Sequence, residues 1–186
     1  MTIDDLIAAL DASADRGLPA AAVRLLGSSR LPPPTEDEIA AFEAEVGARL
    51  PDDYRGFLGR TRGGQLDWYE FDGPTPDGGH WEAIVSHVGG LRDDDSRWSL
   101  RAARRSYQGT EVQIPRALLW IMEDPGGNAV CLGMTGAYRG RVYFWVHDEG
   151  PDPETWDGEV ETAGNVRLVA DSFRAFVAGM RPPEKQ

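Results

Sequence analysis

Three apolar segments decide the fold of this chain: Leu118-Leu119-Trp120-Ile121-Met122, Ala129-Val130-Cys131-Leu132-Gly133-Met134 and Val142-Tyr143-Phe144-Trp145-Val146. Glu123-Asp124-Pro125-Gly126-Gly127-Asn128 separates the first two, and the turn-rich residues 135–140 separate the second from the third. Short runs rich in β-branched and aromatic residues, bounded by Gly, Pro and Asn, are typical of strands. The stretch therefore predicts a three-stranded antiparallel meander that is buried on at least one face.

The flanking segments predict helices first, then strands, then a final helix. Thr2 with Asp5, and Thr35 with Glu38, have the spacing of capping boxes that begin helices. Further helices are predicted over 20–26, from Pro51 to Gly63-Gly64, and after Asp171 or Ser172; strands are predicted over 66–71, 81–88 and 166–169. Residues 98–107 have mixed signals, helical or irregular. This order is typical of an α+β fold with a mainly antiparallel sheet, flanked by N-terminal helices and a C-terminal helix.

The 186 residues predict one main domain with additions at both ends. Residues 1–30 are expected to form an N-terminal helical extension, which either docks on the domain or hangs free. Three consecutive prolines, at 32–34, then mark the start of the α+β domain over 31–181. Residues 182–186 are predicted to be a disordered tail.

The net charge of −12 and the pI near 4.6 narrow the classes of partner. A general nucleic-acid binder needs a basic footprint, and anionic membranes also attract basic segments, so the composition argues against both. No apolar run approaches the roughly 20 residues of a membrane span, and the acidic start is unlike a secretory signal. We therefore expect a cytoplasmic protein. The charge fits either simple solubility or steering toward a basic partner.

The residues that could support chemistry have simpler structural interpretations. His147 beside Asp148 could form a catalytic pair, but a histidine held by its neighbour at a strand end is the favoured interpretation. Cys131 lies inside an apolar strand and is expected in the core. The Gly pairs lack the Lys of a phosphate loop, and Asp93-Asp94-Asp95 lacks the EF-hand pattern, so a solvated loop is favoured over a cation site. We expect no cofactor, no metal and no catalytic residue.

An acidic segment, residues 148–161, follows the meander and contains one tryptophan, Trp156. A tryptophan among carboxylates fits an interface anchor inside a charged rim. Trp68 and Tyr69, on an earlier predicted strand, could belong to the same surface. The alternative, left open, is that the tryptophans are buried and the acids merely solvated. The candidate partner-binding residues are Trp68, Tyr69, Asp148, Glu149, Asp152, Trp156, Asp157 and Glu159.

Four motifs follow one another along the chain. They are Leu50-Pro51-Asp52-Asp53-Tyr54-Arg55-Gly56-Phe57-Leu58 with Gly63-Gly64, Asp124-Pro125-Gly126-Gly127-Asn128-Ala129-Val130-Cys131-Leu132, Gly140-Arg141-Val142-Tyr143-Phe144-Trp145-Val146-His147, and Asp171-Ser172-Phe173-Arg174-Ala175-Phe176. Together they resemble the signature of the SUKH superfamily, the Smi/Knr-type group, over residues 31–180. The chain departs from that pattern at Arg60-Thr61-Arg62, where an asparagine often precedes the Gly pair, and in its N-terminal extension.

The resemblance implies an α+β fold with a curved antiparallel sheet, and it implies no catalysis. Bacterial members of the superfamily are mostly immunity proteins that bind and neutralise a toxin domain of a polymorphic or contact-dependent toxin system. We therefore expect a non-catalytic immunity protein whose partner is a basic toxin domain, with nucleases as one candidate class. The alternative is a regulatory scaffold or adaptor of the Smi/Knr cell-wall-signalling type. An enzyme is a third possibility without a supporting motif, and the oligomeric state is left open.

Overall fold

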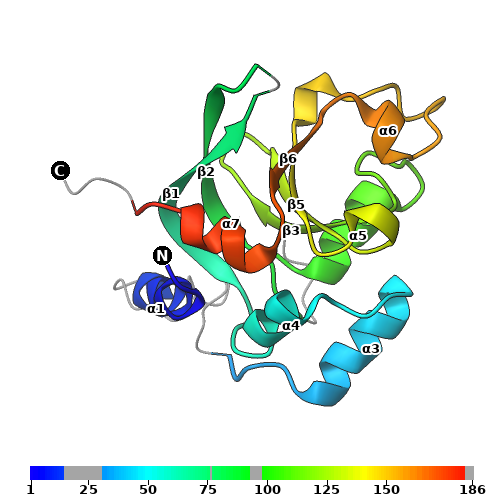
Figure 1. Cartoon of the computed structure of the whole chain (residues 1–186). Coiled ribbons are helices and arrows are strands. Elements are labelled where there is room, and N and C mark those ends of the chain that lie inside the picture. The colour runs from blue at the N-terminus through cyan, green and yellow to red at the C-terminus, as the bar shows by residue number, and fades with distance from the viewer. Residues whose placement is uncertain (15–30, 76, 93–97, 183–186) are drawn as a thin grey trace.

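The computed structural model describes residues 1–14, 31–75, 77–92 and 98–182, and its centre is a curved sheet (Figure 1). The sheet has six strands in the order β1-β2-β3-β4-β5-β6, and every neighbouring pair is antiparallel. The strands are β1 (Gly64–Pro74), β2 (His80–Val88), β3 (Leu118–Glu123), β4 (Ala129–Gly133), β5 (Val142–Trp145) and β6 (Val166–Ala170). Sequence order and spatial order coincide, so the α+β fold with an antiparallel sheet is confirmed.

The helices pack around this sheet. They are α1 (Ile3–Ala14), α3 (Glu36–Val46), α4 (Asp52–Leu58), α5 (Leu100–Gln108), α6 (Val160–Ala163) and α7 (Phe173–Gly179), with 3-10 turns at Gly136–Tyr138 and His147–Glu149. In Figure 1, α7 lies between β1 and α4, while α3 and α4 lie at the lower end of the sheet. Most of the region over 98–107, whose signals were mixed, forms helix α5, and Ser99 caps its start by accepting the Ala102 N–H.

The predicted meander is strands β3, β4 and β5. Every residue in these three strands is buried, so the meander is covered on both faces rather than one. Helix α5 packs against β3 on one side, and the aromatic cluster of α4 and α7 belongs to the same core. In that cluster the rings of Tyr54 and Phe57 each lie 5.1 Å from Phe173, measured between centroids.

The predicted helix starts that fall within the described residues are confirmed. The Thr35 hydroxyl accepts the Glu38 N–H, and the Glu38 carboxylate accepts the Thr35 N–H at 2.7 Å. Thr2 and Asp5 form the same reciprocal pair, and the Ser172 hydroxyl caps α7. These starts depend on neighbours three residues apart, so the local sequence is enough to specify them.

The end predicted at Gly63-Gly64 for the helix that begins at Pro51 was wrong. Helix α4 ends at Leu58 with Gly59 as its cap, and Gly64 begins β1. Gly63 lies where its backbone passes close to the backbone of residues 88–90. A Cβ at this position would lie 2.3 Å from the Val88 carbonyl oxygen. A Cβ on Gly90 would lie 2.0 Å from the Arg62 carbonyl oxygen on the other side of this crossing. The two chain segments therefore meet too closely for any side chain.

The described part of the N-terminal extension packs on the domain. Leu6 and Leu10 of α1 are buried, and α1 contacts β1 and α7. The Met1 ammonium donates a hydrogen bond to the Ala178 carbonyl oxygen at 3.3 Å. The helix predicted over 20–26 lies outside the described residues, and so do residues 183–186 of the predicted tail.

Candidate functional site

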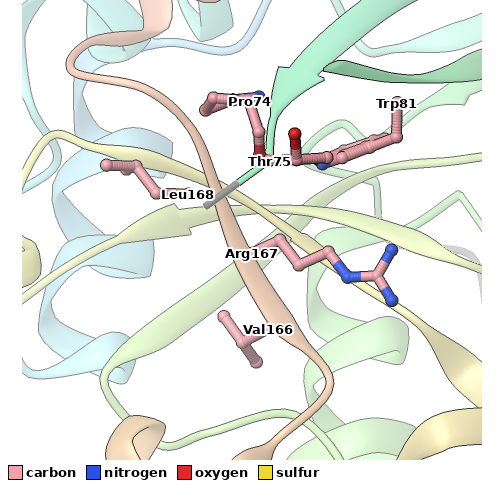
Figure 2. Close-up of a pocket in the computed structure, with 6 residues that line it drawn as sticks. All are labelled: Pro74, Thr75, Trp81, Val166, Arg167 and Leu168. Carbon is pink, nitrogen blue, oxygen red and sulfur yellow. The ribbon is translucent and has the colours of Figure 1, made fainter. Parts of the chain in front are cut away.

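A groove of about 460 Å³ opens between the two edges of the curved sheet. The edge strands β1 and β6 approach each other because the sheet curls, but they form no ladder. Figure 2 shows the lining side chains, three from the end of the β1–β2 hairpin and three from β6. We call this the seam groove, and it is lined by Pro74, Thr75, Trp81, Val166, Arg167 and Leu168.

Trp81 gives the seam groove a fixed apolar wall. Its ring stacks on Phe144 at 5.0 Å between centroids and meets the Phe71 ring edge-on at 5.9 Å. Its indole N–H donates to the Pro74 carbonyl oxygen at 3.2 Å. The residue opposite Trp81 in the ladder is Gly73, where a Cβ would lie 2.0 Å from the indole ring. A glycine in the strand thus makes room for the ring to lie flat.

Arg167 connects the seam groove to the acidic segment. Its guanidinium carbon lies 6.0 Å from the centroid of the Trp81 ring, within the range of a cation–π contact. The same guanidinium forms an ion pair with the Glu149 carboxylate, with 2.6 Å between Nη2 and Oε2. Glu149, predicted as a binding residue, therefore sits beside an apolar groove that the sequence analysis did not detect.

Two carboxylates of the acidic segment accept hydrogen bonds from other residues of the same segment or next to it. Asp157 accepts the Thr162 hydroxyl at 2.6 Å and the Glu159 N–H at 3.1 Å, and the Thr162 bond holds the pKa of Asp157 below its usual range. The Asp152 carboxylate accepts the Glu154 N–H at 3.0 Å. The predicted acids Asp148, Glu149, Asp152, Asp157 and Glu159 are all exposed. They form an anionic surface of defined shape.

The two predicted tryptophans differ in their surroundings. Trp156 is half-buried, and its indole N–H donates to the Thr162 hydroxyl at 2.9 Å. Trp68 is 60% exposed and lies in a bulge of β1, with a positive φ of 37° that non-glycine residues rarely adopt. Tyr69 is half-buried against the core. Trp68 precedes Pro74 by six residues, roughly 20 Å along an extended strand, so it lies away from the seam groove.

The acid–Gly–Gly–Asn turn holds the start of the acidic segment. Asp124 accepts the N–H of Gly126 at 2.7 Å, the N–H of Asn128 at 2.9 Å and the Asn128 side-chain amide at 2.7 Å. The Asn128 side-chain oxygen in turn accepts the His147 N–H at 2.9 Å. The turn after β3 therefore fixes the point at which the chain leaves β5. Its glycines serve the turn, as predicted.

The other candidate groups for chemistry have ordinary surroundings. His147 Nδ1 lies 2.9 Å from an Asp148 carboxylate oxygen, but the Asp148 side chain is 91% exposed. Cys131 is buried, and burial raises the pKa of its thiol. Across the described ranges, no three His, Cys, Asp or Glu side chains converge as metal ligands, and Asp93-Asp94-Asp95 lies outside them. Within the same ranges, no helix has the length and apolar character to cross a membrane.

A family comparison agrees with this fold and these motifs. The model of the SMI1 / KNR4 family (SUKH-1) matches residues 33–179 of the chain. The chain belongs to this family. A relative of this SUKH-1 protein is the SPbeta prophage-derived uncharacterized protein YokK of Bacillus subtilis (strain 168). The two are 27% identical over 158 residues, which cover 77% of this chain and 72% of YokK.

Proposed function

We propose that this SUKH-1 protein is a non-catalytic, cytoplasmic immunity protein. It binds a basic toxin domain of a polymorphic or contact-dependent toxin system and covers that domain's active surface. The observation behind the proposal is the contact between Glu149 and Arg167, which joins an exposed anionic segment to an apolar groove. An apolar centre beside a charged rim is the usual anatomy of a protein–protein interface.

The charge of the chain supports a cationic partner. The net charge of −12 produces a field that attracts basic surfaces, and the exposed acids of residues 148–161 include Glu149, which pairs with Arg167 of the groove. Complementary charge of this kind raises the rate of association more than it raises affinity. Fast capture matters for an immunity protein, because it must reach the toxin before the toxin reaches its target. Many nuclease domains are basic, since they bind phosphate backbones.

The test first looks for a toxin gene beside the gene for this chain and then uses the toxin domain that it encodes; a neighbourhood without one would favour the scaffold alternative. The purified domain is mixed with the full chain, and binding is followed by calorimetry while the toxin's activity is assayed in parallel. We expect a stoichiometric complex and loss of toxin activity at equimolar protein. A toxin domain that neither binds nor loses activity would reject the proposal. Co-purification of the chain from its host with cell-wall-signalling proteins instead would favour the scaffold alternative.

A further inference from the structure

We infer that the seam groove receives one large apolar side chain of the protein partner, an aromatic or leucine residue that lysines or arginines flank in the partner's sequence. The nature of the partner as a toxin rests on the proposed function. The chemistry of the occupant rests on the groove itself. Three observations support it: the lining of the groove, the charge of its rim, and the spacing of the two strands.

The lining favours an apolar group. Trp81 forms one wall and is held in place by Phe144, Phe71 and the Pro74 carbonyl oxygen. Leu168 is 39% exposed, which makes it one of the few large apolar side chains on the described surface. The groove volume of about 460 Å³ lies in the lower part of the range for pockets that take small organic groups. An apolar side chain that fills the groove buries its own surface and the apolar lining away from water, which favours binding.

The rim favours positive charge beside that apolar group. The hairpin contributes Asp72 and Asp77, each within two residues of a lining residue, and the acidic segment contributes Glu149, which pairs with Arg167 of the lining. Arg181 holds the pKa of Asp72 below its usual range, and the Thr75 hydroxyl does the same for Asp77, so both are ionised at neutral pH. The nearby arginines are already paired, Arg181 with Asp72 and Arg167 with Glu149. These three carboxylates therefore outnumber the two arginines beside the groove.

The geometry argues against two other occupants. Cα atoms of β1 and β6 come within 8 Å of each other. An added strand needs roughly 10 Å between its two neighbours, twice the ordinary spacing, so wherever β1 and β6 are this close a side chain fits between them and a whole strand does not. A second copy of this chain would bring the same acidic rim to the opening, and like charges repel. A basic partner that presents a single apolar side chain fits both the narrow spacing of the strands and the acidic rim.

The test uses short peptides and the indole N–H signal of Trp81, which a Trp81→Phe variant assigns in proton–nitrogen NMR spectra of the full chain. The probe is acetyl-KKFKK-amide. Its matched controls are acetyl-KKAKK-amide, which lacks the apolar side chain, and acetyl-EEFEE-amide, which reverses the charge. We expect a saturable shift of the Trp81 signal with KKFKK and at least tenfold weaker binding of both controls. No shift with KKFKK, or an equal response to KKAKK, would overturn the inference.

A pair of protein variants locates the effect. Leu168→Asp places a charge in the seam groove, and Leu31→Asp places one at a comparably exposed leucine outside its lining. We expect Leu168→Asp to weaken KKFKK binding at least tenfold and Leu31→Asp to leave it unchanged. Equal weakening by the two variants would overturn the inference.

The same variants separate the inference from the proposed function. If the toxin domain binds wild type and Leu168→Asp equally well, the immunity proposal stands and the groove is not its docking point. If the toxin domain does not bind but KKFKK still shifts the Trp81 signal, the groove stands as an apolar-anchor site and the immunity proposal fails.

Discussion

The backbone of Arg181 forms two hydrogen bonds with the backbone of Glu70, at 2.9 Å and 2.8 Å. Arg181, two residues after the end of α7, thus pairs with the outer edge of β1. Its guanidinium also donates two hydrogen bonds to the Asp72 carboxylate, at 2.7 Å and 2.8 Å. The C-terminal region therefore covers part of an edge that would otherwise be free to pair with other chains.

This relationship predicts the titration of Asp72. The ion pair favours the carboxylate, so the Asp72 pKa lies below the usual value of about 3.9, and Arg181→Ala should raise it toward that value. Because the folded-state pKa is depressed, the pair stabilises the fold at neutral pH, and this contribution disappears as the pH falls below about 4. Carbon-detected NMR titration measures the pKa. Arg174→Ala serves as the control, and an Asp72 pKa unchanged by Arg181→Ala would contradict the pairing.

The turn after β3 predicts a loss of stability on removing Asp124. This carboxylate is only 8% exposed and accepts three hydrogen bonds. Asp124→Ala removes the acceptor of three hydrogen bonds that hold the turn and should lower the free energy of unfolding by about 1–2 kcal/mol, measured by urea denaturation. Asp148→Ala removes an exposed carboxylate nearby and should leave the midpoint unchanged. Equal midpoints for the two variants would show that the turn does not depend on Asp124.

Alanine should have opposite effects at two glycines, one at the crossing between Arg62-Gly63 and Gly89-Gly90 and one in an open part of helix α4. Gly90→Ala forces a methyl group against the Arg62 carbonyl and should cost at least about 2 kcal/mol of unfolding free energy. Gly56→Ala lies inside helix α4 with open space around it, so it should stabilise the chain by about 0.4–1 kcal/mol. Thermal unfolding followed by circular dichroism measures both. A stable Gly90→Ala variant would mean that the two backbones are not in close contact.

The acidic segment predicts salt-sensitive association with the toxin domain. Within the described residues, the Glu154 and Glu159 side chains accept no hydrogen bond and form no ion pair, so Glu154→Lys with Glu159→Lys changes charge with little effect on the loop. We expect about a tenfold lower association rate in low salt, shrinking at high salt as screening shortens the reach of the field. Stopped-flow mixing measures this rate.

The control for that experiment changes the same amount of charge elsewhere. Asp11→Lys with Asp37→Lys alters α1 and α3, outside the acidic segment, and should slow association less. If both double variants slow association equally, net charge alone steers the partner. If neither slows it at low salt, the partner does not approach the acidic segment.

The elements of the fold were predictable because their signals are local. Strands β3 to β5 are apolar runs between turn residues, and the caps at Thr35 and Ser172 depend on residues three positions away. The end of α4 was missed because Gly63 is a glycine for a reason that lies elsewhere, at the crossing with Gly90. No local pattern distinguishes that glycine from a helix stop.

The candidate site was predictable only in part. Residues 148–161 are visible in sequence as a run of acids, but the seam groove depends on Trp81 and Arg167 meeting across the curl of the sheet. Nothing near either residue specifies that curl. The glycine at 73, inside a strand and beside Pro74, is the one local sign that a bulky group approaches there. Trp156 was predicted as an anchor, and its bond to Thr162 shows what holds its ring.

The strictly sequential order of the strands has a consequence for how partners change over time. Each strand pairs only with its neighbours in the chain, so a connecting loop can lengthen or shorten without shifting the register of any other pair. Thr75, in the β1–β2 connection, lines the seam groove, and Glu149, in the β5–β6 connection, pairs with Arg167 of its lining. Recognition can therefore diverge from one relative to the next while the framework that presents it stays the same.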